Sequence, residues 1–229
     1  QGFWGRNARR IESETAHMRE IFNRKLDFYL TSPGPCPYLP DREERKVFTP
    51  LMGQDAAELN ESLTHAGFRR SQNIAYRPAC ATCASCLSAR VVVDAFEDTK
   101  RWRKIRRLNE DLVRIPRPAI AVREHFRLLS KYLDARHPSG GMAGMSIRDF
   151  TSMIEETRIN SVLFEYRLRP APGEEPDSGA LIGVALSDVL RDGLSMVYSF
   201  FDVDHSRRSM GSYMILDHIA NARHLGIHY

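Results

Sequence analysis

The hydrophobic positions in the first half of the chain predict one clear helix. Leu59 and Leu63 lie four residues apart, which is typical of the buried side of a helix. Asp55 can cap this helix at its start, and Gly67 can end it in a left-handed turn. We therefore expect a short amphipathic helix between Asp55 and Gly67.

The segments on either side of this helix predict irregular structure and short strands. Residues 28–50 contain five prolines, which remove backbone donors and predict a stiff, packed loop. The β-branched run at 87–93 predicts a strand, and residues 72–76 are a weaker candidate for its partner.

The second half predicts two helices, three strands and a last helix. Apolar positions recur at helical spacing over 122–133, and Ser146 followed by Asp149 forms a capping-box pattern for another helix. Strand-like runs follow at 161–168, 180–188 and 194–203, and their order predicts an antiparallel meander. A final helix over 210–224 should end at Gly226.

These elements predict an α+β protein. Pro116 and Pro118 break the preceding helical pattern and mark our expected junction. We expect a charged N-terminal segment at 1–27, a smaller cysteine-containing domain at 28–115 and a catalytic domain at 116–229. The element order of the last part is similar to that of GNAT-type acyltransferases, although several α+β folds share it.

Composition fits a folded protein that is mildly basic. The 229 residues are 42% hydrophobic and 27% charged, with a formal net charge of +4. Such a charge suits an anionic partner without requiring one. Because we find neither an apolar run of about 18 residues nor a signal-peptide pattern, we expect a cytoplasmic protein without a membrane partner.

Four cysteines are candidates for a metal site. Cys80, Cys83 and Cys86 follow one another at intervals of three, and Cys36 could supply a fourth ligand to zinc or an iron-sulfur cluster. The competing interpretation is that small, reduced side chains pack a corner of the fold. One continuous run with one distant cysteine differs from the two separated pairs of a zinc ribbon, so both interpretations stay open.

The loop before the last helix is a candidate anion site. Backbone N–H groups at a helix start, with Arg207, Arg208 and Gly211 beside them, suit a phosphate. Tyr213 stands where the acyl-CoA loop of GNAT enzymes needs a second small residue, which argues against acyl-CoA. The alternative is an ordinary helix start with solvated arginines.

The strongest positive surface predicted by the sequence lies on a helix over 100–107. Its cations could neutralise nucleic-acid phosphates, although most such runs are only solvated faces. The residues concerned are Lys100, Arg101, Arg103, Lys104 and Arg107.

Two long motifs resemble the aminoacyl-tRNA-protein transferases. Residues 67–90, which contain the cysteine run, resemble the N-terminal signature of that family, and residues 198–213 resemble its C-terminal signature. The segments 35–40 and 136–142 extend the likeness. The residue sequence of the proline-rich loop and the compact length of the chain resemble the bacterial leucyltransferase branch more than the eukaryotic arginyltransferases.

The resemblance implies transfer of leucine from leucyl-tRNA to proteins with N-terminal Asp or Glu, which marks them for degradation. It implies a GNAT-like catalytic half and no cofactor required for the chemistry. Two departures stand out: Val203 replaces an expected proline, and the chain stops at Tyr229, where such a sheet should continue. We therefore expect the catalytic half to be incomplete at its C-terminus.

Candidate roles follow from the chemistry and from motif position. An aminoacyl ester is already activated, so attack by a free amine needs positioning and an oxyanion partner rather than a covalent nucleophile. Asp202 and Asp204 could hold an ammonium or the terminal ribose, and Tyr198 could orient the ester. The acceptor carboxylate needs a fixed cation, for which the candidates are Arg69, Arg70, Arg77 and Arg90.

Three other functions remain open from the sequence alone. The protein could use arginyl-tRNA, act as a CoA-dependent N-acetyltransferase, or bind RNA around a structural zinc without catalysis. The sequence leaves open the oligomeric state and the identity of any general base.

Overall fold

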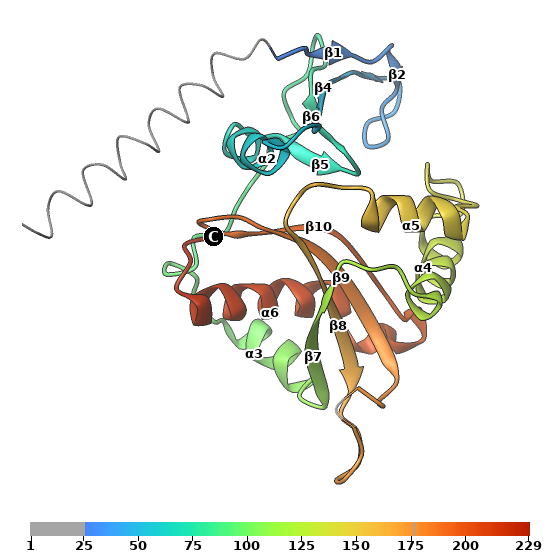
Figure 1. The fold of residues 1–229 in the computed structure, drawn as a ribbon, viewed down its shortest axis with the longest axis vertical. Coiled ribbons are helices and arrows are strands. Elements are labelled where there is room, and N and C mark those ends of the chain that lie inside the picture. The colour runs from blue at the N-terminus through green and yellow to red at the C-terminus, as the bar shows by residue number, and fades with distance from the viewer. Residues whose placement is uncertain (1–25, 176) are drawn as a thin grey trace, which may run out of the picture. The chain divides into compact units, whose positions relative to one another are not determined.

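The computed structural model describes residues 26–175 and 177–229, which form two compact units (Figure 1). Within the described residues, unit 1 ends at Leu87 and leaves out the short stretch Arg70–Asn73. Unit 2 consists of Arg70–Asn73 and Ser88–Tyr229. Most of the segment expected at 1–27 lies outside the described residues.

Unit 2 begins earlier than the junction that we expected after residue 115. Pro116 and Pro118 lie within strand β7 (Leu112–Pro118), which pairs with β8 (Ser161–Leu168). β7 is an edge strand, where a proline can be tolerated because one side of the strand has no partner to bond. The two prolines therefore belong to the sheet of unit 2 and do not separate domains.

Unit 1 contains a four-stranded sheet in the order β1-β4-β6-β5 and a small hairpin, β2-β3. The strands are β1 (Tyr29–Leu30), β2 (Gly34–Pro35), β3 (Glu43–Glu44), β4 (Lys46–Pro50), β6 (Ile74–Pro78) and β5 (Arg69–Ser71), of which only Arg69 is counted in unit 1. β6 covers part of the weaker strand candidate at 72–76, but its partners are β4 and β5 and not residues 87–93.

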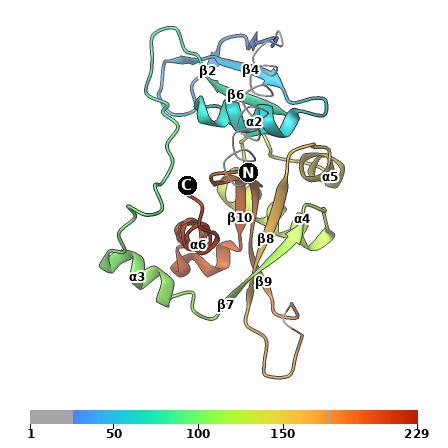
Figure 2. The ribbon, with the colours of Figure 1, turned by 60° about the vertical axis from the view of Figure 1, so that its left-hand side comes forward.

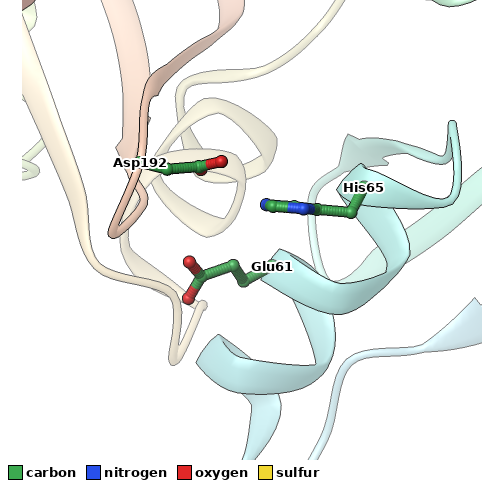
Figure 3. A group of neighbouring side chains, drawn as sticks. All are labelled: Glu61, His65 and Asp192. Carbon is green, nitrogen blue, oxygen red and sulfur yellow. The ribbon is translucent and has the colours of Figure 1, made fainter. Parts of the chain in front are cut away.

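The helix expected after Asp55 is α2 (Ala56–His65), and it buries Leu59 and Leu63 as the spacing predicts. Asp55 is the N-cap residue, but its side chain makes no capping hydrogen bond. Glu61 and His65 lie one turn apart on this helix (Figure 3).

The strand expected at 87–93 is wrong. Residues 87–92 form no regular secondary structure and pair with no strand of the described chain, and Val91 and Val92 are exposed. Val93 is buried, and its N–H donates to the carbonyl of His228 at 2.9 Å. β-branched residues favour extended backbone, but only a neighbouring strand makes that backbone a sheet.

Unit 2 is built on an antiparallel sheet in the order β10-β9-β8-β7. β8, β9 (Leu181–Val189) and β10 (Leu194–Phe201) confirm the expected meander. Helices α4 (Arg123–Arg136) and α5 (Ile147–Glu155) lie on one side of the sheet, and α3 (Lys100–Arg107) and α6 (Met210–Leu225) lie on the other (Figure 2).

Each face of this sheet carries its own core. Leu129 and Phe150 pack from α4 and α5 onto Phe200, while Met210 and Met214 pack from α6 onto the opposite face. The burial of large apolar side chains on both faces stabilises the unit. The sheet is therefore a rigid layer that fixes the loops at its ends.

The ends of two helices also follow the sequence. Ser146 and Asp149 form the expected capping box at the start of α5. Gly226 ends α6 with φ of 69°, a left-handed conformation that glycine adopts without strain. The α+β fold class is confirmed. Across the described residues, the structure contains no helix with the length and apolar character to span a membrane.

Candidate active site

An acidic pair and a lysine meet where β10 ends. After β10 the chain forms a short 3-10 helix, η1 (Val203–Arg208), and Asp202 caps it by accepting a 3.0 Å hydrogen bond from the N–H of Asp204. Lys131 of α4 places its Nζ 2.6 Å from Asp202 Oδ1 and 2.6 Å from Asp204 Oδ2. The structure thus brings two of our candidate residues together and adds a cation that the sequence did not reveal.

The charges of this group reinforce one another. Burial is the largest single influence on the pKa of Asp202 and works to raise it, but the hydrogen bonds from Lys131 and the Asp204 N–H, together with the charge of Lys131, lower the pKa. His205 adds a smaller favourable charge. The pKa of Lys131 is raised by its hydrogen bonds to Asp202 and Asp204. At neutral pH the cluster therefore consists of carboxylates and an ammonium.

Tyr198 lies on the face of the sheet that α4 and α5 cover, where it packs against the core. It follows a β-bulge in β10, where the pairing with β9 shifts between Met196 and Tyr198. Bulges re-aim side chains and recur beside active sites. Burial, with a smaller contribution from Tyr132, raises the pKa of Tyr198, so its phenol keeps its proton at neutral pH and can donate a hydrogen bond.

The far end of η1 is fastened to α3. Arg208 makes two hydrogen bonds with the carboxylate of Asp111, at 2.6 and 2.7 Å. Asn109, which is fully buried, donates from Nδ2 to the carbonyls of Ile105 and Arg208, both at 2.9 Å. Asp111 thus compensates the charge of Arg208. The role of Arg208 is therefore to hold the end of η1 in place.

The other members of the expected anion site remain accessible. Arg207 is exposed, and Gly211 lies in the first turn of α6. A Cβ added to Gly211 would meet the Phe201 ring at 3.6 Å, an ordinary contact, so packing within the chain does not require glycine there. An anion at this helix start remains a prediction.

The basic helix forms as expected, with Ile105 buried and Trp102 half-buried. An open hollow of about 640 Å³ is lined by Lys100, Arg103, Lys104, Arg107 and Leu108. Arg101 is not among these residues, and its guanidinium lies over the Trp102 ring at 5.0 Å. Four of the five predicted cations therefore gather around one concave surface.

The four arginines expected to bind an acidic acceptor have different surroundings. Arg70 is buried and bonded to Asp188, so it is not the free cation that we expected. Arg69 and Arg77 are exposed in unit 1, where Arg77 lies over the Phe68 ring at 5.1 Å.

Arg90 belongs to unit 2. Its guanidinium lies 4.2 Å from the centre of the Tyr229 ring, and the Tyr229 carbonyl accepts a hydrogen bond from the N–H of Leu194 in β10. Arg69, Arg77 and Arg90 are therefore the exposed candidates for the acceptor carboxylate.

All four cysteines are reduced and lie in unit 1. Cys80 Sγ lies 3.8 Å from the carbonyl of Arg45. A hydrogen bond with Ser85 is the main cause of the lowered pKa of Cys83. Within the described chain, no three cysteine sulfurs lie within 4.8 Å of one another, so these positions do not by themselves form a coordination sphere. A metal bound by Cys36, Cys80, Cys83 and Cys86 stays a prediction.

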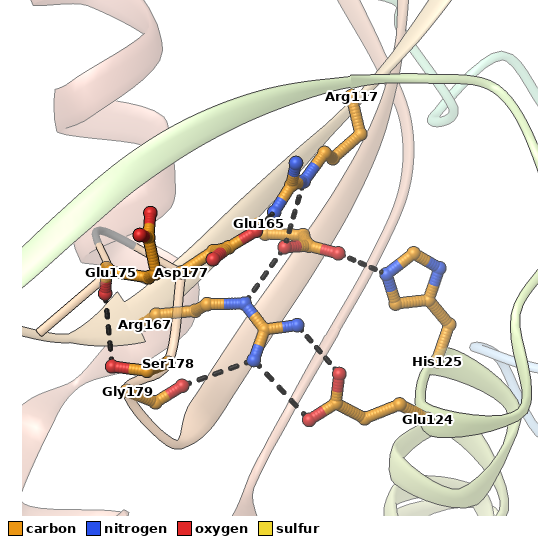
Figure 4. A network of polar contacts seen from close by, with 9 residues as sticks. All are labelled: Arg117, Glu124, His125, Glu165, Arg167, Glu175, Asp177, Ser178 and Gly179. Carbon is orange, nitrogen blue, oxygen red and sulfur yellow. Dashed lines mark hydrogen bonds and ion pairs between the residues drawn. The ribbon is translucent and has the colours of Figure 1, made fainter.

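A buried charge network holds the N-terminal end of α4 to the sheet (Figure 4). Glu165 accepts hydrogen bonds from Arg167 at 2.8 Å and Arg117 at 3.3 Å, and its other oxygen lies 2.7 Å from His125 Nε2. Burial works to raise the pKa of Glu165, but these hydrogen bonds lower it to about 2. Arg167 continues the network to Glu124 of α4.

A second buried network involves a serine and a histidine but is no nucleophilic site. Ser187 Oγ lies 2.7 Å from His218 Nε2, and His218 Nδ1 lies 2.8 Å from the carbonyl of Met214. Ser187 is completely buried, so a substrate cannot reach it. Burial also lowers the pKa of His218, which fits a neutral residue of the core.

Comparison with known proteins identifies the family. The model described as "Arginine-tRNA-protein transferase, N terminus" matches residues 34–104, and the corresponding C-terminus model matches residues 124–229. A protein of Nitrobacter hamburgensis named aspartate/glutamate leucyltransferase is 52% identical over 215 residues, covering 94% of this chain and 82% of that protein. The chain belongs to the aminoacyl-tRNA-protein transferase family.

A second relative supports the same assignment. The protein of the same name from Methylorubrum extorquens is 53% identical over 222 residues, covering 94% of this chain and 86% of that protein. As a member of the aminoacyl-tRNA-protein transferase family, the protein is a transferase, which confirms the resemblance found in residues 67–90 and 198–213.

The sequence analysis did not predict several polar residues that the structure places in the site and in the buried networks. Lys131 occupies a polar position of an amphipathic helix and carries no motif of its own. Glu165 and Arg167 did leave a signal, because they are charged residues two apart within an apolar strand and therefore share one face.

Proposed function

We propose that the protein transfers leucine from leucyl-tRNA to the N-terminal Asp or Glu of acceptor proteins. The reaction would take place in the cytoplasm and would mark the acceptor for degradation. Support comes from relatives at 52–53% identity whose name states aspartate/glutamate leucyltransferase.

The observation that carries this proposal is the link between a basic surface and an acidic pair. The hollow on α3 suits the phosphates of a tRNA, and η1 begins directly after Asp202. Asn109 and Arg208 fasten the end of α3 to η1. A tRNA bound on α3 would thus dock against the element that presents Asp202 and Asp204.

The chemistry requires no covalent intermediate on the enzyme. The acceptor α-amino group, with an ordinary pKa near 8, is partly neutral at cellular pH and attacks the ester carbonyl. The developing oxyanion accepts a hydrogen bond from the Tyr198 phenol, which stays protonated. The bond from the carbonyl carbon to the ribose oxygen then breaks, the attacking nitrogen gives up a proton to solvent, the ribose oxygen takes one from solvent, and tRNA leaves with its terminal hydroxyl restored.

An acidic acceptor side chain would be held by an exposed guanidinium. Arg69, Arg77 and Arg90 are the candidates that remain, because Arg70 already satisfies Asp188. Exchanging each for alanine and comparing peptides that begin with Asp and with Ala would identify the residue. Selective loss of transfer to the Asp peptide is the expected result for the residue that grips the carboxylate.

In this proposal the cysteines have only a structural role, which is to stabilise unit 1. Their thiolates could take zinc or an iron-sulfur cluster if Cys36 and the 80–86 run closed around it. Elemental analysis of protein purified without chelator tests this. Fully active protein free of metal would end the metal proposal and leave the transfer reaction untouched.

One assay tests the reaction. The protein is mixed with radiolabelled leucyl-tRNA or arginyl-tRNA and with peptides beginning with Asp, Glu, Lys or Ala. Label should pass from leucyl-tRNA to the Asp and Glu peptides alone. Label only from arginyl-tRNA would favour the alternative donor that the family description names, and no label from either donor would refute transfer. A parallel arm with acetyl-CoA tests the acetyltransferase alternative.

A further inference from the structure

We propose that Lys131 is a positioning residue, which sets Asp202 and Asp204 as a carboxylate pair that holds the α-ammonium of the aminoacyl donor. This inference rests on the proposed function and assigns one chemical group of the donor to one place in the fold. Lys131 does not touch the donor in this scheme, because it acts through the two carboxylates.

The geometry places one ammonium and two carboxylates in direct contact. Lys131 Nζ bridges Asp202 Oδ1 and Asp204 Oδ2, with both distances at 2.6 Å. Asp202 Oδ1 also accepts the N–H of Asp204. Within residues 26–175 and 177–229, Asp202 Oδ2 and Asp204 Oδ1 accept no hydrogen bond, so each carboxylate keeps one oxygen for a ligand.

The charge count leaves room for one more cation. Two carboxylates and one ammonium carry a net charge of −1, since the structure pairs Lys131 with both acids. A single monovalent ammonium would complete the group, and charge-assisted hydrogen bonds to carboxylate oxygens are among the stronger polar contacts. Asp204 is largely exposed, so a ligand can approach the pair from solvent.

The pair suits the donor amine and not the attacking amine. A carboxylate beside an amine favours its protonated form, and a protonated amine cannot attack the ester. The acceptor α-amino group must be neutral, so contact with Asp202 and Asp204 would slow the reaction. The donor α-amino group takes no part in bond formation, and as an ammonium it makes the adjacent carbonyl carbon more electrophilic.

The segment is held at both ends, which gives the pair a fixed position. Next to Lys131, Tyr132 packs its ring 5.1 Å from that of Phe201, the residue before Asp202. The Asp202 N–H donates to the carbonyl of Ile182 at 2.8 Å. Lys131 is the only described side chain that bonds to both carboxylates, so its loss would leave two like charges to repel each other.

The test compares two donors within the same protein sample. One donor is leucyl-tRNA, and the other is N-acetyl-leucyl-tRNA, which has the same ester and tRNA but carries no ammonium. The ratio of kcat/KM for the two donors is independent of the folded fraction, so a purely structural defect does not change it. The variants are Lys131→Met, Lys131→Arg and the control Arg127→Met, an exposed cation one turn earlier on α4.

We expect the wild type to prefer the free donor, and we expect Lys131→Met to reduce that preference by roughly 10-fold to 100-fold, the range of one charge-assisted hydrogen bond. Lys131→Arg should restore most of the preference, because a guanidinium can also bridge two carboxylates. Arg127→Met should behave as the wild type.

An unchanged donor ratio in Lys131→Met would overturn the role of Lys131 while leaving leucine transfer intact. A wild type that uses both donors equally would overturn the ammonium assignment. A wild type that transfers from neither donor would refute the proposed function, and the positioning role with it.

Discussion

The guanidinium of Arg70 and the carboxylate of Asp188 meet in two hydrogen bonds of 2.7 Å, and each side chain is only 1% exposed. Arg70 also donates to the carbonyl of Gln72 and to Ser161 Oγ. Four of its five donors are thus used inside the protein. This pair explains why a residue of the N-terminal signature need not touch substrate.

Replacement of Arg70 by alanine should therefore destabilise the protein. It removes the cation from the buried Asp188 carboxylate, to which Ser161 Oγ still donates at 2.8 Å, and loss of one member of a buried ion pair typically costs about 3–5 kcal/mol. Denaturant titration gives this loss, and the double variant Arg70→Ala with Asp188→Ala should lose less than the two single variants together. The control is Arg69→Ala, an exposed neighbour that should cost less than about 1 kcal/mol. Equal losses for Arg69 and Arg70 would contradict this assignment.

The basic hollow should set the affinity for tRNA and its dependence on salt. Replacing Arg103, Lys104 or Arg107 by a neutral residue should remove one phosphate contact and weaken tRNA binding. Each replacement should also lower the slope of log affinity against log salt by about 1. Fluorescence titration of tRNA at several salt concentrations measures both effects. Arg148→Gln, an exposed cation on α5, is the control and should change neither. A slope unaffected by loss of all three cations would locate the tRNA elsewhere.

The contact between Asn109 and Arg208 should transmit the position of bound tRNA to the acidic pair. Asn109→Ala removes the donors to two carbonyls, which should cost about 1–3 kcal/mol of stability. We expect kcat to fall while tRNA affinity and its salt slope stay close to those of the wild type, because the cations of α3 are intact. Asn160→Ala, an exposed asparagine of the same unit, is the control. A fall in tRNA affinity with unchanged kcat would contradict this coupling.

Patterns within single elements predicted most of the fold of unit 2. Three strand-like runs predicted the meander, the Ser146 pattern predicted a capping box, and Gly226 predicted the end of α6. β7 was missed because Pro116 and Pro118 suggested a break, and only its edge position shows why they are tolerated. The position of a strand in a sheet depends on which strands pair with it, so it cannot be predicted from one segment alone.

The candidate site was predictable only where a motif carried it. Asp202 and Tyr198 stood out by motif position, but the partners that set their environment are distant in sequence. Lys131 reaches Asp202 across 71 positions, and Asp188 reaches Arg70 across 118. Such contacts depend on helix and strand packing, so composition and spacing could not reveal them.

The carboxylate of Glu165 should make stability depend on pH in the acid range. Its pKa falls from an ordinary 4.5 to about 2 in the folded protein, where Arg167 and His125 bond to it. Because the folded value is the lower one, the stabilisation is fully present above about pH 4.5 and is lost as the pH falls through about 2. At neutral pH it amounts to roughly 3 kcal/mol. The free energy of unfolding of the wild type should therefore exceed that of Glu165→Gln most at neutral pH, and the difference should shrink as the pH falls toward 2. Denaturant titrations of both proteins from pH 7 to pH 2 measure it, and a difference that stays constant over this range would contradict the lowered pKa.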